Sequence, residues 1–170
     1  VKLTPSLVEN SSLERWISFQ SDHTVRVATG KVEIGQGILT ALAQIAAEEL
    51  DVELDTVQVL SGSTIHGPNE QYTTSSLSVE VSGGSIRLVC AQVRARMLDR
   101  MAQRLNCDRD ALSIDNGTFM LDGQGRVITK AAKCNTGVLG NCGQRERNHK
   151  NEYNNQSGQR TGSYFCGQYN

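Results

Sequence analysis

The apolar residues between positions 86 and 105 are spaced so that they form one long stripe along a helix. The stripe consists of Ile86, Cys90, Val93, Met97, Met101 and Leu105. Because an α-helix turns once every 3.6 residues, this spacing keeps one face against a core over about five turns. The arginines of the segment lie largely off the stripe: Arg87, Arg94, Arg96, Arg100 and Arg104. We interpret them as a solvated face, with phosphate binding as the alternative.

The other regular patterns lie before residue 130 and are short. Asn116-Gly117 is a strong hairpin signal, and residues 21–23 form a tight turn that makes His23 a turn residue. The predicted elements are strands at 16–20, 24–28, 57–60, 112–115 and 118–121, an extended segment at 31–34, and a helix at 38–50. Because these elements lack a repeated βαβ spacing, we predict an α+β fold, a mixed sheet of short strands with two main helices.

The patterned region ends near residue 130. Residues 1–130 are predicted to form one domain, whereas Asn, Gly and Gln dominate residues 131–170. Too few apolar side chains remain there to offset the entropy cost of ordering the backbone. We therefore predict a polar tail that is disordered or translated out of frame. Its Cys134, Cys142, His149 and Cys166 lack the paired spacing of structural zinc sites, so we expect no metal ligands.

The charge balance excludes one class of partner. The 170 residues include 17 Lys and Arg against 18 Asp and Glu, a net charge of −1. Proteins that neutralise a phosphate backbone carry a basic excess, so no nucleic-acid partner is expected. No run approaches the roughly 18 apolar residues that a membrane span needs. We expect a chain without a membrane span, located in the cytoplasm, with the periplasm left open.

Two segments have groups suited to holding a ligand. In the Gly-Gln-Gly loop (Ile34, Gly35, Gln36 and Gly37), the glycines let the backbone approach a ligand, and the first amides of the following helix are expected to be free for an anion. The amide of Gln36 suits the edge of a heterocycle. The hydroxyl-rich turn (Thr73, Thr74, Ser75, Ser76, Leu77 and Ser78) is expected to cap a helix and to bind ligand oxygens.

Other active-site patterns are incomplete. Gly35-x-Gly37-x-x-Thr40 imitates a dinucleotide-binding fingerprint, but Thr40 replaces its third glycine. Glu33 and Glu70 flank the two candidate segments as a conceivable acid/base pair, yet no triad accompanies them. The residues alone therefore predict no catalytic site.

A longer pattern carries a family resemblance. The block GKVEIGQGILTALAQIAAEEL at 30–50 is followed by DTVQV at 55–59, Thr64, Pro68-Asn69 and TTSSLS at 73–78. This pattern resembles the molybdopterin-binding subunit of the xanthine oxidase and aldehyde oxidase family. It is similar to the branch with isoquinoline 1-oxidoreductase and nicotinate dehydrogenase large subunits, over roughly residues 5–125.

The resemblance implies a cofactor, a reaction and a partner. The cofactor would be molybdopterin, with the cytosine dinucleotide form as one candidate. Gln36 would contact the pterin and residues 73–78 would form the pterin-binding turn, where Ser75 replaces the usual glycine or alanine. The family hydroxylates aromatic heterocycles or aldehydes with oxygen from water, and passes electrons to iron–sulfur clusters on a partner subunit or domain.

Some of the family's motifs have no counterpart in this chain. These are the glycine-rich loops that line the metal pocket and the Gly-Val-Gly-Glu segment that supplies the catalytic base. We therefore predict a fragment of a molybdenum hydroxylase subunit that binds part of the cofactor and is inactive alone. The alternatives are a stand-alone nucleotide- or phosphate-binding module and a non-functional truncated product.

Overall fold

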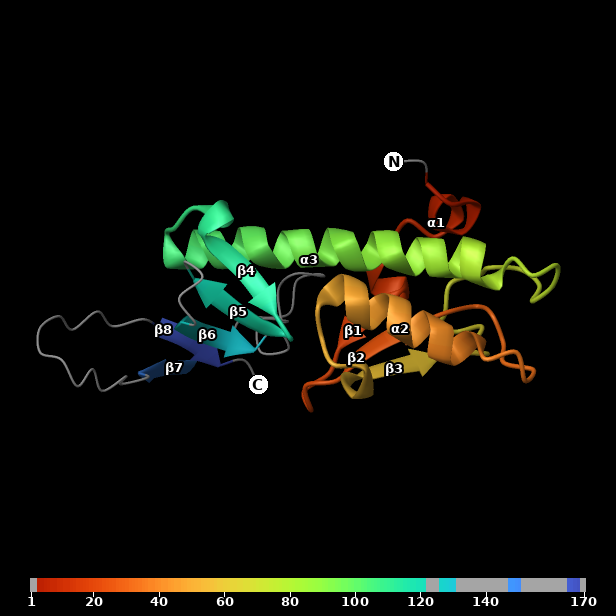
Figure 1. Cartoon of the computed structure of the whole chain (residues 1–170), viewed down its shortest axis with the longest axis horizontal. Coiled ribbons are helices and arrows are strands. Elements are labelled where there is room, and N and C mark those ends of the chain that lie inside the picture. The colour runs from red at the N-terminus through yellow and green to blue at the C-terminus, as the bar shows by residue number, and fades with distance from the viewer. Residues whose placement is uncertain (1–2, 122–125, 131–146, 151–164, 169–170) are drawn as a thin grey trace, which may run out of the picture.

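The structure, a computed structural model, describes residues 3–121, 126–130, 147–150 and 165–168. Its longest element is α3 (Gly84–Leu105), which runs along the length of the molecule (Figure 1). One half of α3 covers a sheet with the helix α2 (Ile38–Leu50), and the other half lies over a second sheet. This layering of short sheets and helices confirms the predicted α+β class.

The first sheet contains β1 (Ile17–Phe19), β2 (Val25–Ala28) and β3 (Val57–Leu60). β1 pairs antiparallel with β2, and β2 pairs parallel with β3. The strands predicted at 16–20, 24–28 and 57–60 are thus confirmed, and His23 lies in the turn with a φ of 70°. α2 forms the crossover between the two parallel strands, which places the Gly-Gln-Gly loop between β2 and α2.

The extended segment predicted at 31–34 is not a strand. Its backbone bonds to side chains instead, because Val32 N–H donates to Thr73 Oγ1 and Ile34 N–H donates to Gln36 Oε1. The Lys31 side chain is also buried, at 4% exposure. Alternation of polar and apolar residues did not distinguish this loop from a strand.

The two main helices share one core with the first sheet. Of the predicted stripe, Ile86, Cys90, Val93, Met97 and Met101 are buried and Leu105 is partly buried. The helix predicted at 38–50 is confirmed as α2, which begins after Gly37 and ends before Asp51, two residues with positive φ. The long helix is thus a packing element, and the candidate segments lie where both helices begin (Figure 1).

The second sheet contains β4 (Leu112–Asp115), β5 (Thr118–Leu121) and β6 (Arg126–Lys130), all antiparallel. The predicted hairpin is confirmed, and Asn116 and Gly117 both have the positive φ that a tight two-residue hairpin loop requires. This sheet lies at the end of α3 far from the candidate segments (Figure 1).

The remaining elements are short. They are α1 (Pro5–Glu9), η1 (Leu13–Arg15), η2 (Leu54–Thr56), a π-helical segment η3 (Ser78–Gly83), η4 (Arg109–Ala111), β7 (Arg147–Lys150) and β8 (Phe165–Gln168). β7 and β8 pair antiparallel within the predicted tail. The other residues of 131–170 lie outside the described residues, as do the side chains of Cys134, Cys142, His149 and Cys166. The expected disorder or out-of-frame origin of the tail and the expected lack of metal ligands in it therefore stay predictions.

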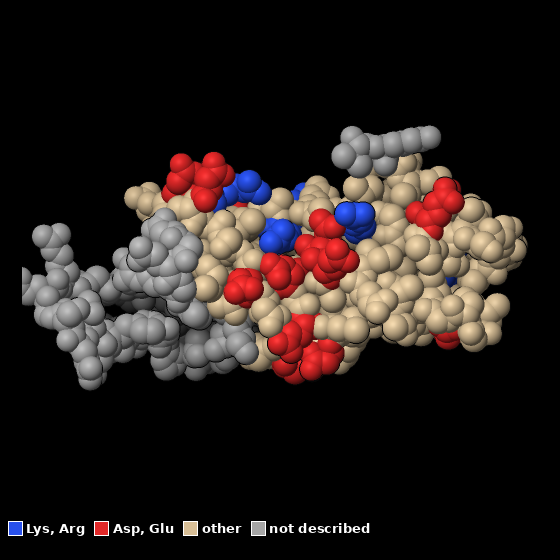
Figure 2. Space-filling model, viewed as in Figure 1, with Lys and Arg blue, Asp and Glu red and all other residues tan. Residues whose placement is uncertain are grey.

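The surface charge is mixed. Arg87 and Arg94 of α3 pair with Glu49 and Asp51, at 3.1 and 3.4 Å, which supports the solvated-face interpretation. On the face drawn in Figure 2, acidic side chains gather near the middle, with basic groups among them. Within the described ranges, no helix is long and apolar enough to cross a bilayer.

Candidate functional site

The Gly-Gln-Gly loop is held by the carboxylate of Glu33. Glu33 Oε1 accepts hydrogen bonds from Gly35 N–H at 2.8 Å and Gly37 N–H at 2.9 Å, and Oε2 accepts from Leu39 N–H at 3.2 Å. Among the first amides of α2, that of Leu39 is therefore not free, contrary to the expectation. The Glu33 carboxylate occupies the place predicted for a bound anion, because a carboxylate is a good acceptor at a helix N-terminus.

These bonds shift the titration of Glu33. The backbone N–H of Gly37, with smaller effects from Leu39 and Gly35, holds the pKa of the exposed Glu33 carboxyl below its ordinary value. Amide donors favour the charged form of an acid, which has more acceptor capacity than the neutral form. The loop is thus fixed by an ionised group near neutral pH.

Gln36 forms a second clip within the same loop. Its Oε1 accepts from Ile34 N–H at 2.6 Å, and its Nε2 donates to the Val32 carbonyl at 2.9 Å. Residues 32–37 are all exposed. An amide side chain has two N–H groups and two lone pairs on its oxygen, so each end of Gln36 retains capacity for a ligand beyond these bonds.

The hydroxyl-rich turn does not cap a helix as predicted. The segment that follows it, η3, is π-helical, and Leu77 at its N-cap position makes no side-chain capping bond. Ser75 and Ser76 instead adopt the left-handed conformation, with φ values of 57° and 56°. Such a conformation is uncommon for residues other than glycine. Consecutive left-handed residues turn the chain sharply, and the side chains of Thr74, Ser75, Ser76 and Leu77 are exposed.

A direct bond joins the hydroxyl-rich turn to the chain that leads into the Gly-Gln-Gly loop. Val32 N–H donates to Thr73 Oγ1 at 3.0 Å, across 41 residues of sequence. The structure therefore brings together the two segments that the sequence predicted separately. Thr73 acts as the link, while the other hydroxyls of the turn remain on the surface.

A buried lysine strengthens this junction. Lys31 Nζ donates to the carbonyls of Glu70 and Tyr72, both at 2.7 Å. Lys31 lies three residues before the Gly-Gln-Gly loop, and the two carbonyls lie within three residues before the turn, so one side chain holds the chain leading into both. The sequence did not predict this role, because the residues next to a loop lysine do not indicate whether its side chain is buried or exposed.

Glu70 is the second buried ionisable group, at 4% exposure. Its carboxylate accepts from Thr29 Oγ1 at 2.7 Å, Gly30 N–H at 2.9 Å and Ser82 Oγ at 2.7 Å. The conceivable acid/base pair of Glu33 and Glu70 is therefore not supported. The two carboxylates have separate hydrogen-bond partners. Glu33 lies on the surface and accepts from the Gly-Gln-Gly loop and the start of α2, whereas Glu70 lies in the interior and accepts from Thr29, Gly30 and Ser82.

A pocket of about 200 Å³ lies beside this junction. Its lining includes Lys31, Glu70, Tyr72, Thr74 and Leu77. Glu9 of α1 also lines it, so acidic groups accompany the single lysine. A free phosphate is disfavoured in such surroundings, which counts against the phosphate-binding alternative.

The available groups fit the polar edge of a pterin. Such an edge presents both donors and acceptors, and the Gln36 amide and serine hydroxyls offer both. The exposed hydroxyls and the spare capacity of Gln36 lie on segments joined to each other. The α2 N-terminus, which Glu33 fills, contributes no free amides at Gly35, Gly37 or Leu39 to a ligand phosphate.

Comparisons with known proteins agree with this fit. The sequence profile of the molybdopterin cofactor-binding domain matches residues 3–168, which extends past the predicted domain boundary at 130. A nicotinate dehydrogenase subunit of Pseudomonas putida is 37% identical over 118 residues, covering 69% of this chain and 10% of its own length. Subunit gamma of the 6-hydroxypseudooxynicotine dehydrogenase complex of Paenarthrobacter nicotinovorans is 32% identical over 105 residues, or 62% and 13% of the two chains. The chain thus spans a small part of these relatives.

Solved structures show the same fold. Quinoline 2-oxidoreductase from Pseudomonas putida 86 matches 69% of this chain and 15% of its own, with a TM-score of 0.60 and 26% identity. The Cu,Mo-CO dehydrogenase shares the fold with a TM-score of 0.61 over 69% of this chain and 15% of its own, at 24% identity. With nearly the whole sequence matched by the profile, the chain belongs to the molybdopterin cofactor-binding domain family.

Proposed function

We propose that the Gly-Gln-Gly loop and the hydroxyl-rich turn of this chain together hold one molybdopterin cofactor. The observation that carries the proposal is the pair of bonds at Val32, whose N–H donates to Thr73 of the turn and whose carbonyl accepts from Gln36 of the loop. Gln36 would bond to the pterin edge, and Thr74, Ser75 and Ser76 would bond to its oxygens and nitrogens. Ile34, Gly35, Gly37, Leu77 and Ser78 would shape the surface around it.

In this proposal the residues of the chain hold the cofactor in its orientation, and the cofactor supplies the chemistry. The bound cofactor would supply oxidative hydroxylation of an aromatic heterocycle or aldehyde, with water as the source of oxygen. Protein groups contribute position and electrostatics to such chemistry. Gln36 and the hydroxyls would move no proton, since neutral amides and alcohols are poor acids and bases near pH 7. No residue of the chain is assigned a catalytic role.

The finer parts of the proposal concern the form of the cofactor and the partner. The cytosine dinucleotide is one candidate form of the cofactor, and the family resemblance implies an iron–sulfur subunit or domain that receives electrons. Two relatives are named as subunits, one of nicotinate dehydrogenase and one of the 6-hydroxypseudooxynicotine dehydrogenase complex, which supports an assembly of several chains.

Cofactor retention tests the proposal. The full chain would be produced in a host that makes molybdenum cofactor, and molybdenum and phosphorus would be measured in the purified protein. We expect both elements to co-elute with the chain and Gln36→Ala to lose them. Gln92→Ala serves as the control, because Gln92 is an exposed glutamine on α3.

Two results would contradict the proposal. The assignment of the loop fails if Gln36→Ala retains as much molybdenum as the control. Stabilisation of the chain by a nucleotide, without any molybdenum bound, would instead support the phosphate-binding module.

A further inference from the structure

Lys31 and Glu70 are the two most completely buried side chains of the acidic and basic residue types (Asp, Glu, Lys and Arg) in the part of the chain that the structure describes. Each is 4% exposed. Burying a charged group is costly unless hydrogen bonds replace its lost water. Here they do so: three donors surround the Glu70 carboxylate and two carbonyls accept from Lys31.

The partners of these two side chains come from three separate segments, residues 29–30, 70–72 and 82. Glu70 connects the end of β2, through Thr29 and Gly30, to η3 through Ser82. Lys31 connects the start of the loop region to the chain that leads into the hydroxyl-rich turn. The chain that leads into each candidate segment is therefore anchored to the same buried cluster, which we name the lock (Thr29, Gly30, Lys31, Glu70 and Ser82).

The neighbouring backbone leaves the lock little freedom. A Cβ atom added at Gly30 would lie 2.5 Å from the Pro68 carbonyl oxygen and 3.0 Å from Glu70 N. The backbone at Gly30 and the backbone at residues 68–70 thus lie too close together for any side chain at position 30. This close approach fixes the spacing at which Val32 reaches Thr73.

We propose that Lys31 and Glu70 are positioning residues, which set the distance between the Gly-Gln-Gly loop and the hydroxyl-rich turn so that both contact one cofactor. This inference rests on the proposed function. It goes beyond that function by assigning a role to two buried groups that the proposed function leaves without one. They act through Val32 and Thr73, whose bond reports directly on the spacing.

The test uses amide hydrogen exchange and molybdenum content on the same full chains. The Val32 amide is the reporter, because its protection depends on the acceptor Thr73 Oγ1. The variants are Lys31→Met, which removes the charge but keeps an unbranched side chain, and Thr73→Val, which removes only the acceptor. Thr73→Ser restores a hydroxyl, and Arg94→Met is the matched control for loss of a cation far from the lock.

We expect Lys31→Met and Thr73→Val to increase the exchange rate of the Val32 amide by about tenfold or more, with β4 and β5 unchanged. Both should retain less than about half of the molybdenum of the parent chain, whereas Thr73→Ser and Arg94→Met should match the parent. If Lys31→Met does not fold, Thr73→Val alone decides, because a missing surface acceptor leaves the core intact.

Two outcomes overturn the inference in distinguishable ways. Faster Val32 exchange with full molybdenum content would show that the spacing does not matter for binding, while the proposed function stands. A parent chain that never retains molybdenum, despite a protected Val32 amide, would overturn the proposed function and the positioning role with it.

Discussion

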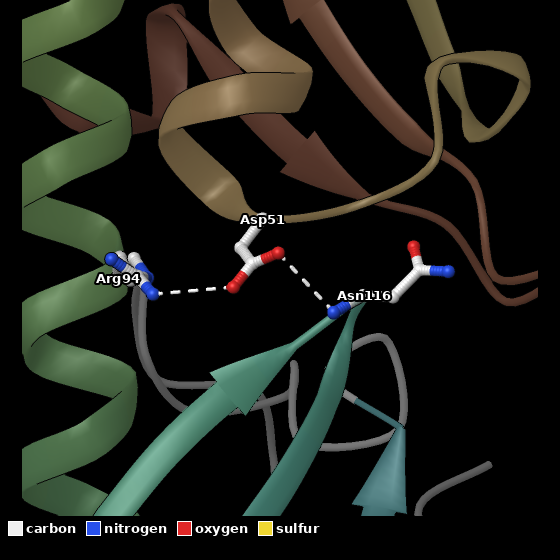
Figure 3. Close-up of polar contacts among 3 residues, drawn as sticks. All are labelled: Asp51, Arg94 and Asn116. Atoms are coloured by element: carbon white, nitrogen blue, oxygen red, sulfur yellow. Dashed lines mark hydrogen bonds and ion pairs between the residues drawn. The ribbon is translucent and has the colours of Figure 1, made fainter.

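Two polar clusters in this molecule join segments that are far apart in the sequence, and they differ in exposure. The lock lies in the interior beside the candidate site, with both ionisable groups 4% exposed. The second cluster surrounds Asp51 at the far end of α2 (Figure 3). There, Asp51 accepts from Arg94 Nη2 at 3.4 Å and from Asn116 N–H at 3.2 Å, which joins α2, α3 and the β4–β5 turn.

The number of elements that a cluster joins does not determine how much it stabilises the fold. The side chains of Arg94 and Asp51 are 36% and 38% exposed, so water and salt weaken their attraction. The carboxylate of Glu70 has no such competition, and its hydroxyl and amide donors would be left unpaired without it. Both clusters connect three elements, but only the buried one is expected to determine stability.

Removing the carboxylate of Glu70 should have the largest effect. Glu70→Ala leaves two hydroxyls and one backbone N–H without an acceptor in the interior, so we expect a loss of about 3–5 kcal/mol in the free energy of unfolding. Glu70→Gln keeps one acceptor oxygen and should lose less. Urea denaturation of both variants measures the difference, and equal losses would contradict this expectation, because the acceptor oxygen that Gln retains would then contribute nothing.

A methyl group at Gly30 should have the next largest effect. Because the new Cβ would meet backbone atoms of Pro68 and Glu70, which cannot rotate away, we expect Gly30→Ala to cost about 1–3 kcal/mol. Gly84→Ala is the control, since its Cβ would meet only a methyl carbon of Thr4 at 3.3 Å. Thermal unfolding of the pair checks this, and an unaffected Gly30→Ala would contradict the close approach.

The charge of Arg94 should matter least for stability. We expect Arg94→Met to change the free energy of unfolding by less than about 1 kcal/mol, because the pair is half-exposed. Its buried Nε also lacks a hydrogen-bond partner among the described residues, so removing the guanidinium removes a cost as well. Urea denaturation at low and high salt measures this, and a loss as large as that of Glu70→Ala would erase the contrast between the clusters.

A third carboxylate, that of Glu33, should respond to pH, because it stabilises the fold only while it is ionised. Its pKa is lowered in the folded chain, so the bonds to Gly35 and Gly37 are complete above the ordinary value of 4.5 and are lost as pH falls through the lowered value. The amide proton shifts of both glycines should move in that acidic range. In Glu33→Gln they should stay constant with pH, and a parent chain that behaves likewise would contradict the carboxylate clip.

Local patterns were enough to predict most of the fold. The stripe from Ile86 to Leu105, the helix at 38–50 and the Asn116-Gly117 hairpin each depend on neighbours within a few residues, so the sequence shows them directly. The segment at 31–34 was predicted as extended but forms no strand, because the hydrogen-bond partners of Lys31 and Val32 lie about 40 residues away. Alternating polarity cannot report such partners.

The candidate site was predicted as two places and not as one. The Gly-Gln-Gly loop and the hydroxyl-rich turn have local compositions suited to ligands, which made both visible. Their junction depends on Lys31, whose bond to the Glu70 carbonyl spans 39 residues. The capping by Glu33 was also missed, because it requires a loop conformation that brings three amides to one carboxylate.

The central claim is that two segments form one cofactor-binding surface. The most direct test is hydrogen exchange, followed by mass spectrometry, of the full chain from a host that makes molybdenum cofactor and from one that does not. The account predicts that the cofactor slows exchange in residues 34–37 and 73–78 together, with the β4–β5 hairpin unchanged. Protection of only one segment, or of neither in a chain that contains molybdenum, would contradict it.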